Sequence, residues 1–314
     1  MPEGDTIFRA ARTLHRALAG GVVTRFETQY AQLARVHDDA PITGRVVDKV
    51  EPRGKHLLMH FSAVTRAHVG TVSAGRGAAK DTEGRSGVTA PGPNAGLPVD
   101  GPIVLRTHML MSGSWHIYRT GEPWQRSAGS ARIVVGTHAF VAVAFTVPIA
   151  EFVLAHEVEE ALARVGPDVL ASDFDEAQAI ARLSASGRPT AAEALLDQRA
   201  VAGIGNVFKS ELLFLARLWP FTSPAAVSHE QWARLMRDAR VLLRANVVDP
   251  TESGVLTYRG ARRTTGRSNP AERLYVYGRN GRPCRRCGTP VRLQHHGEHN
   301  RSTYWCPRCQ PHPG

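Results

Sequence analysis

The sequence lacks any run of 18 apolar residues, the length that a helix needs to cross a membrane. It also lacks the basic region and apolar stretch of a signal peptide, since acidic residues occur within its first 20 positions. No basic amphipathic stretch is long enough to lie on a membrane surface. We therefore expect a cytoplasmic protein without membrane contact.

Acidic residues are few relative to basic ones. The chain contains 28 Asp and Glu residues and 39 Lys and Arg residues, which gives a net charge of +11 and a pI near 10.1. This surplus favours a polyanionic partner. The 314 residues, 42% of them hydrophobic, are enough for two or three domains with packed cores.

Cysteine is absent from the first 283 positions, and all four cysteines follow as two C-x2-C pairs separated by eighteen residues: Cys284, Cys287, Cys306 and Cys309. This spacing is typical of two knuckles that supply four thiolates to one tetrahedral Zn²⁺. Disulfides do not suit a chain without a secretion signal. Four thiolates leave no open position, so the zinc is expected to be structural, and His295, His296 and His299 to be surface residues. Five arginines crowd this segment and suit phosphate contact: Arg285, Arg286, Arg292, Arg301 and Arg308.

Hydrophobic periodicity divides the rest of the chain into an α+β fold. Apolar residues at helical spacing in residues 7–18 predict one amphipathic N-terminal helix. Seven runs then have the composition of short β-sandwich strands: 22–28, 46–50, 56–61, 103–107, 113–118, 131–136 and 140–145. The Gly-, Ala-, Ser- and Pro-rich stretch 63–100 breaks this pattern and is expected to be a flexible insertion.

Helical periodicity dominates the second half. TAAE at 190–193 is a capping box, and a turn with Gly203 and Gly205 leads to a second helix that begins at Asn206. A helix start offers unpaired N–H groups to a phosphate, although such a turn more often only joins two core helices. A longer helix is expected over 228–245. The domains predicted are 1–150, 151–273 and 274–314.

The chain opens with MPEGDT. Methionine is readily removed when proline follows, so we expect the mature chain to begin at Pro2. Its nitrogen would then be a secondary amine, unlike that of any other proline. Glu3 lies beside it. The simpler interpretation is that this segment only opens a helix, since proline suits the first turn and acids suit its positive end.

Five motifs in order resemble the formamidopyrimidine-DNA glycosylase and endonuclease VIII family. They are MPEGDT, PRGKHLL at 52–58, THMLMSGSW at 107–115, LLDQRAVAGIGNVFKSE at 195–211, and NRSTYWCPRCQ at 300–310. The resemblance implies a β-sandwich, a helix-two-turn-helix domain and a zinc finger. It also implies a bifunctional glycosylase and lyase of base excision repair, which acts on damaged DNA as a monomer at the bacterial nucleoid.

The resemblance assigns roles to six residues. The Pro2 nitrogen would attack the sugar carbon that bears the damaged base, Glu3 would move protons, and Lys55 would contact the adjacent phosphate and assist β-elimination. Asn206 would bind phosphate. Arg301 would grip phosphates around the flipped nucleotide and assist δ-elimination. Met111 would fill the space that the flipped base leaves, unless it packs inside the sandwich.

Family members that act on oxidised guanine carry a PRRFG-like stretch where this chain has AVAFTVPIAEF. That departure, with the PEGDT opening, favours the endonuclease VIII branch and oxidised pyrimidines. An oxidised-purine enzyme, a catalytically silent DNA-binding relative and an RNA-binding protein with a zinc knuckle are the other hypotheses.

Overall fold

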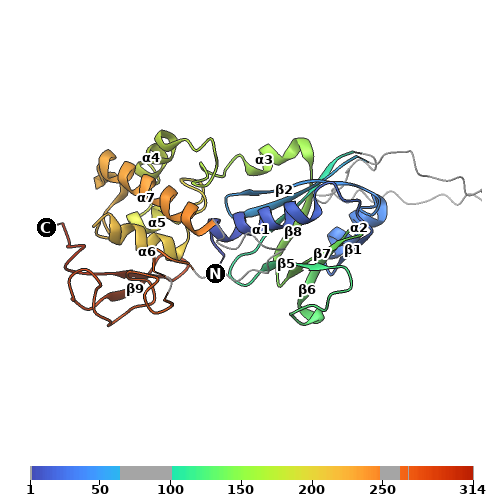
Figure 1. Cartoon of the computed structure of the whole chain (residues 1–314). Coiled ribbons are helices and arrows are strands. Elements are labelled where there is room, and N and C mark those ends of the chain that lie inside the picture. Colours follow the sequence, from blue (N-terminus) through green and yellow to red (C-terminus); the bar gives the residue numbers. More distant parts are fainter. Residues whose placement is uncertain (1, 64–100, 248–261, 268, 314) are drawn as a thin grey trace, which may run out of the picture.

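The computed structural model describes residues 2–63, 101–247, 262–267 and 269–313 of the chain. Its described residues form two lobes, a β-sandwich and a helical lobe that carries the C-terminal finger (Figure 1). The N-terminal end of the chain lies at the junction between them. The predicted insertion 63–100 lies outside the described residues except for Ala63. No helix among the described residues is long and apolar enough to cross a membrane.

The sandwich consists of two antiparallel four-stranded sheets, in the orders β2-β3-β4-β8 and β1-β6-β7-β5. Its strands are β1 Arg25–Thr28, β2 Val47–Arg53, β3 His56–Phe61, β4 Ile103–His108, β5 Ser114–Arg119, β6 Ala131–Gly136, β7 Phe140–Phe145 and β8 Ile149–Leu154. The prediction of a β-sandwich is confirmed. Alternate residues of both sheets face one another in a shared core, as the period of two requires.

Helix α1 (Gly4–Leu18) packs against strands of both sheets, and its buried face is formed by the predicted apolar residues. Its buried residues include Ile7, Ala11, Leu14 and Leu18, each at most 2% exposed. Full burial of each large aliphatic side chain contributes about 1.5–3 kcal/mol. The same helix contacts α7 of the other lobe, so it fixes the N-terminal residues at the junction.

The first predicted strand, 22–28, was too long. Val22 forms an isolated bridge with Val46, whereas Thr24 N donates to the carbonyl oxygen of Gly136, the last residue of β6. The chain therefore passes from one sheet to the other within this run. The elements that were not predicted include α2 (Ala31–Asp39) and β8, which pairs with β4 and so crosses the expected domain boundary at residue 150.

Helix α3 (Val158–Leu162) packs against β3 and β4 of the sandwich. The helical lobe contains α4 Glu176–Ser184, α5 Ala191–Ala194, α6 Asn206–Leu215 and α7 His229–Val247. Short 3-10 turns cover Ala128–Ser130, Ala155–Glu157 and Pro224–Ala226. Only half of the predicted capping box is present. Glu193 N donates to Thr190 Oγ1 at 3.2 Å, but the Glu193 carboxylate accepts from the Thr190 hydroxyl rather than from the Thr190 backbone N–H. The sequence placed the start of α6 correctly at Asn206.

The finger is a hairpin of β9 (Arg292–His296) and β10 (Arg301–Trp305) above two cysteine knuckles. Phe214 of α6 is buried in its small core, where it stacks on Tyr275. Glu211 is fully buried and accepts hydrogen bonds from the backbone N–H groups of Tyr275, Val276 and Tyr277. Helix α6 therefore anchors the finger to the helical lobe.

Candidate active site

Pro2 and Glu3 immediately precede α1 at the junction of the lobes. Glu3 is completely buried, and its two carboxylate oxygens accept hydrogen bonds from Val207 N at 2.8 Å and Phe208 N at 3.3 Å. These N–H groups belong to the first turn of α6, whose own N-cap is a glycine without a side chain. Glu3 therefore caps a helix more than 200 residues away in sequence.

This arrangement decides between two interpretations of the turn before α6. The start of a helix can offer unpaired N–H groups to a phosphate, although such a turn more often only joins two core helices. Because Glu3 accepts from Val207 and Phe208, those two donors are already used. The anion at this helix start is a side chain of the protein itself.

Three glycines permit the close approach of the N-terminal segment to the turn before α6. Gly4 N donates to Gly203 O at 2.8 Å. A Cβ on Gly4 would lie 2.7 Å from the Gly203 Cα, and one on Gly205 would lie 2.3 Å from the Glu3 Cγ. Gly203 also has a φ of +97°, which side-chain-bearing residues rarely adopt. The AGIG sequence is thus required for this contact.

Lys55 lies in the tight turn between β2 and β3, next to Gly54, whose φ is +59°. Gly54 N donates to Asp168 Oδ2 at 2.7 Å, which ties the hairpin to the helical lobe. Burial lowers the pKa of Lys55 to about 8, opposed by the nearby Glu3 carboxylate and reinforced by Arg301. Lys55, Glu3 and Arg301 therefore lie within electrostatic reach of one another, although they come from three distant segments.

Arg262 is a site residue that sequence reasoning did not single out. Its guanidinium donates to both oxygens of the buried Asp5, with Nε 3.1 Å from each, and its Nη1 lies 3.8 Å from Glu3 Oε1. The same group lies over the Phe208 ring. Its position in the basic run RGARRTTGR was the only signal, and that run indicated charge without a partner.

Lys209 contacts both Asn206 and the finger, and it was not predicted from the sequence as a site residue. Lys209 is completely buried, and its Nζ donates to Asn206 Oδ1 at 2.7 Å, Ser302 O at 2.9 Å and Thr303 Oγ1 at 2.6 Å. Asn206 Nδ2 donates to Ser302 Oγ at 3.0 Å. Burial lowers the pKa of Lys209 to about 7, and Glu3 opposes this shift.

Met111 does not pack inside the sandwich. It lies in the turn between β4 and β5 and is 55% exposed, beside Leu110, which is 45% exposed and has a φ of +44°. Arg301 Nη1 lies 3.4 Å from Met111 Sδ. His108, a further residue that was not predicted, accepts a hydrogen bond from Leu110 N, and burial, with Lys55 nearby, lowers its pKa to about 4.

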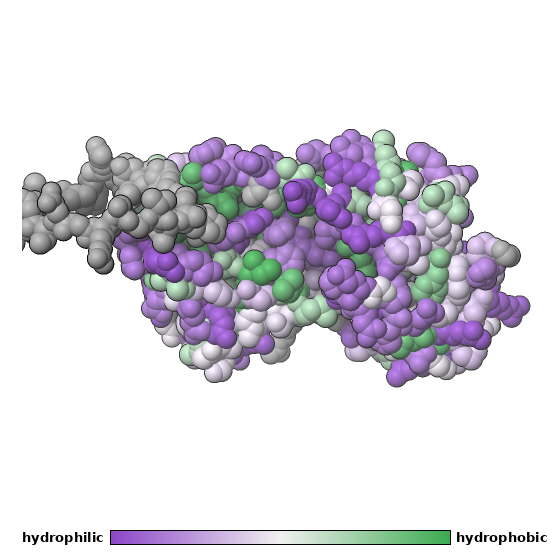
Figure 2. All heavy atoms as spheres, turned by 180° about the vertical axis from the view of Figure 1, so that it is seen from behind, coloured by the Kyte–Doolittle hydropathy of each residue, from purple (hydrophilic) through white to green (hydrophobic). Residues whose placement is uncertain are grey.

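Figure 2 shows a notch between the two lobes. Hydrophilic side chains gather on its helical and finger side, and a small hydrophobic group reaches the surface on the side of the sandwich. Lys55, Arg262 and Arg301 place positive charge around one buried carboxylate. Such a site can bind an anionic ligand and exchange protons with it.

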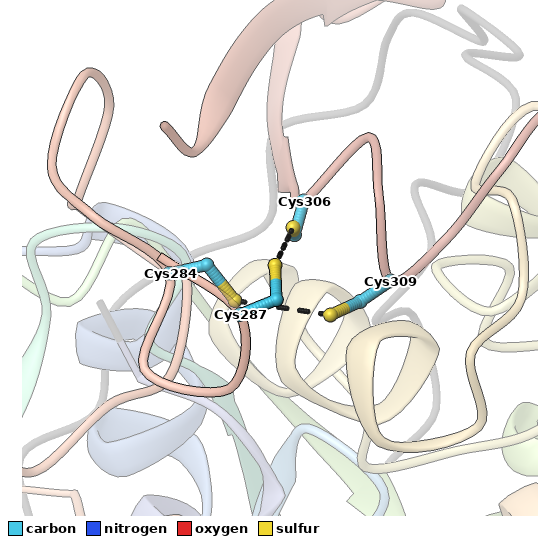
Figure 3. A group of neighbouring side chains, drawn as sticks. All are labelled: Cys284, Cys287, Cys306 and Cys309. Carbon is cyan, nitrogen blue, oxygen red and sulfur yellow. Dashed lines mark hydrogen bonds between the residues drawn. The ribbon is translucent and has the colours of Figure 1, made fainter. Parts of the chain in front are cut away.

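The four cysteines converge from two knuckles (Figure 3). Their Sγ atoms all lie within 4.8 Å of one another, with Cys284 and Cys309 3.9 Å apart and Cys287 and Cys306 3.4 Å apart. Tetrahedral Zn–S bonds of about 2.3 Å place sulfur atoms about 3.8 Å apart. The four thiols therefore fit one zinc ion, and none of them forms a disulfide.

The histidines of the finger were only partly predicted. His295 and His299 are exposed, as expected. His296 is not a surface residue, because its side chain is 10% exposed and lies between Glu193 and Thr303. It does not belong to the cluster of possible metal ligands.

Comparisons with known proteins agree with this architecture. Residues 1–146 match the model of the formamidopyrimidine-DNA glycosylase N-terminal domain, and residues 165–256 match that of the formamidopyrimidine-DNA glycosylase H2TH domain. A probable endonuclease 8 2 of Streptomyces coelicolor is 38% identical over 100% of this chain and 97% of its own length. A DNA-(apurinic or apyrimidinic site) lyase Nei2 of Mycolicibacterium smegmatis is 33% identical over 99% of both chains.

Solved structures share the fold. A Lactococcus lactis formamidopyrimidine-DNA glycosylase in complex with DNA that contains an oxidised pyrimidine superimposes with a TM-score of 0.72 at 19% identity, over 99% of this chain and 100% of that one. Both family domains, their order and the full-length relatives lead to one assignment. The chain belongs to the formamidopyrimidine-DNA glycosylase and endonuclease VIII family, on its endonuclease VIII branch.

Proposed function

We propose that this protein is a bifunctional DNA glycosylase and lyase of base excision repair, which excises oxidised bases and then cleaves the strand at the abasic site. The observation that carries the proposal is the position of Glu3. It is buried beside Pro2 at the start of α6, within electrostatic reach of Lys55 and Arg301. A segment that only opened a helix would not need this contact with the second lobe.

The Pro2 nitrogen, once Met1 is removed, is the nucleophile. Its lone pair forms a bond to C1′ while the bond from C1′ to the base breaks. The base leaves with that electron pair and takes up the proton that the attacking amine loses. Glu3 supplies a proton to the ring oxygen as the sugar opens to an iminium. Such acid–base assistance contributes roughly 10² to 10⁴ in rate.

The iminium also explains strand cleavage. Its positive charge acidifies the proton on C2′, and loss of that proton expels the 3′ phosphate by β-elimination. Lys55 contacts the phosphate beside the lesion and assists this step. Arg301 binds phosphates around the flipped nucleotide and assists δ-elimination at the 5′ side, so one adduct serves both activities.

DNA binding uses both lobes. Asn206 and Arg301 contact phosphates from the helical lobe and its finger, and Met111 enters the stack from the sandwich. The exposure of Met111 supports its role, because a wedge must reach a partner outside the protein. A flipped base leaves a space that costs stacking energy unless an apolar side chain fills it.

Zn²⁺ is the proposed metal, held by Cys284, Cys287, Cys306 and Cys309. Four thiolates complete its coordination, so the ion would stabilise the finger and take no part in the reaction. The finger presents Arg301 at the start of β10. Metal binding would therefore act on DNA affinity through the position of this arginine.

Oxidised pyrimidines are the preferred substrates in this proposal. The chain lacks the PRRFG-like stretch of enzymes that act on oxidised guanine, and relatives that match its whole length are named endonuclease 8. A relative named formamidopyrimidine-DNA glycosylase matches only 48% of the chain. Oxidised purines remain the second candidate. The protein would act as a monomer on nucleoid DNA in the bacterial cytoplasm.

Borohydride trapping tests the proposal. The protein is incubated with a duplex that contains thymine glycol or an abasic site, and borohydride is added to reduce the iminium. We expect a covalent protein–DNA adduct and, without borohydride, a nicked strand. A silent DNA-binding relative or an RNA-binding protein would bind without forming either product, and that result would overturn the proposal. The same assay on a second duplex that contains 8-oxoguanine shows whether oxidised pyrimidines or oxidised purines are the preferred substrates.

A further inference from the structure

Lys209 has no part in the proposed chemistry, yet it is among the largest completely buried side chains. It lies one turn after Asn206 on α6 and donates to Asn206 Oδ1, Ser302 O and Thr303 Oγ1. Below its pKa of about 7 the side chain is an ammonium, which has three N–H donors and no acceptor, so these three contacts use its full capacity. All three acceptors are uncharged.

We propose that Lys209 is a positioning residue for DNA binding. It turns the Asn206 amide so that its NH₂ group faces the phosphate, and it fixes the β10 strand that begins with Arg301 against α6. This inference rests on the proposed function, since it names the residue that places two of its phosphate ligands.

The orientation of the Asn206 amide follows from donor and acceptor chemistry. Only the amide oxygen can accept a hydrogen bond from an ammonium, so Lys209 excludes the flipped amide, whose NH₂ would face another donor. Nδ2 donates to Ser302 Oγ and carries a second N–H. A phosphate accepts hydrogen bonds and never donates them when ionised, so it requires this NH₂ side.

The finger depends on the same ammonium. Ser302 and Thr303 directly follow Arg301 on β10, and both accept hydrogen bonds from Lys209. Thr303 Oγ1 also contacts His296 on β9, so both strands of the hairpin are linked to α6. Loss of the ammonium would release the Asn206 amide and the strand of Arg301 together.

A lysine is a costly residue for packing alone. Burying an ammonium without a carboxylate partner is unfavourable, and an apolar side chain of similar length would dock the finger at lower cost. A bound phosphate would offset part of this cost, because it adds negative charge near the buried cation. The cost is therefore consistent with a role that needs three donors and a positive charge.

A double-mutant cycle tests this inference. The variants are Lys209→Met, which keeps length and removes all donors, Asn206→Ala, and the combination of both. Arg234→Met on the exposed side of α7 controls for the loss of one positive charge. The measurements are the Kd for a duplex with a tetrahydrofuran abasic-site analogue, zinc content and Tm.

We expect Lys209→Met to raise Kd roughly tenfold or more, the range of a charge-assisted hydrogen bond, while zinc content stays at the wild-type level. In the double variant, the two losses of affinity should add to less than their sum, because part of the effect of Lys209 passes through Asn206 and only the part that acts on the strand of Arg301 remains. Arg234→Met should change Kd less than threefold, roughly.

Three results would overturn the inference: wild-type affinity of Lys209→Met, fully additive losses in the double variant, or a loss of affinity that accompanies loss of zinc. If Lys209→Met fails to fold, Thr303→Val replaces it in the cycle, since it removes one acceptor of the same ammonium. The binding measurements need no turnover. If the wild-type protein formed no trapped adduct, that result would count against the proposed function, while the double-mutant cycle could still be interpreted.

Discussion

The guanidinium of Arg301 donates to Sδ of Met111 at 3.4 Å, and this contact joins the finger to the β4–β5 turn of the sandwich. The two residues are proposed to act on different parts of the DNA, the phosphates and the base stack. The contact therefore brings the proposed phosphate ligand and the proposed wedge side by side. The contact is weak, because thioether sulfur is a poor acceptor.

Replacement of Arg301 by alanine should weaken binding to all lesions about equally and reduce the salt dependence of binding. Removal of one phosphate contact lowers the slope of log K against log salt by about 0.9. The measurement is Kd for several lesion duplexes across a salt series. Arg234→Ala, at an exposed arginine of α7, controls for the loss of one positive charge outside the finger. An unchanged slope for Arg301→Ala would remove this residue from the phosphate contacts.

Met111 carries no charge, so Met111→Ala should leave the salt slope unchanged. It should reduce excision of thymine glycol from duplex DNA about tenfold more than from single strands, where no base stack needs filling. That ratio corresponds to about 1.4 kcal/mol. Both substrates are measured at matched salt. Equal losses on the two would assign the wedge to another residue of the turn, with Leu110 as the first candidate.

Local patterns were enough to predict much of the fold. The apolar residues at helical spacing predicted the buried face of α1, and the apolar runs predicted β3, β6 and β7 with the correct bounds. Helix α2 was missed because its N-cap, Tyr30, makes no side-chain capping bond, so only the packing of Leu33 and Val36 identifies it.

The site was predictable where a residue type carries its own chemistry. A proline at position 2 and four spaced cysteines are informative without a structure. Three further features could not be predicted, because they join segments more than 90 residues apart in sequence: the cap that Glu3 places on α6, the pairing of Arg262 with Asp5, and the contacts of Lys209 with the finger. Burial and partners of such groups depend on the tertiary fold.

Removal of the metal should release the finger and leave the sandwich folded. We expect one zinc per chain by elemental analysis, and Cys306→Ser, at a completely buried ligand, should lose it. Affinity for damaged duplex should fall at least tenfold, roughly the value of one charged phosphate contact. His299→Ala, at an exposed histidine of the hairpin, should keep both metal and affinity. Full loss of zinc with unchanged affinity would separate the finger from DNA binding.

The pKa of Lys55, about 8, makes a prediction about pH. The ammonium predominates at pH 7 and is lost as pH rises through 8, and a phosphate binds the ammonium better than the neutral amine. Affinity should therefore be greatest below pH 8. At pH 9 about a tenth of the ammonium remains, so the Lys55 contribution should weaken up to roughly tenfold. Lys55→Arg stays charged throughout and should show a smaller loss. Other titrating groups, such as Lys209, are common to both proteins, so parallel curves would count against Lys55.

The nucleophile is the most direct test of the chemistry. A variant that retains an extra residue before Pro2 turns its nitrogen into an amide, which is neither basic nor nucleophilic. This variant should still bind an abasic-site duplex but form no borohydride-trapped adduct, whereas Pro2→Gly, with a primary amine at the same place, should keep a small part of the activity. Mass spectrometry of each N-terminus verifies processing. Strong trapping by the extended variant would move the nucleophile elsewhere, with Lys55 the first candidate because burial leaves part of its amine neutral at pH 8.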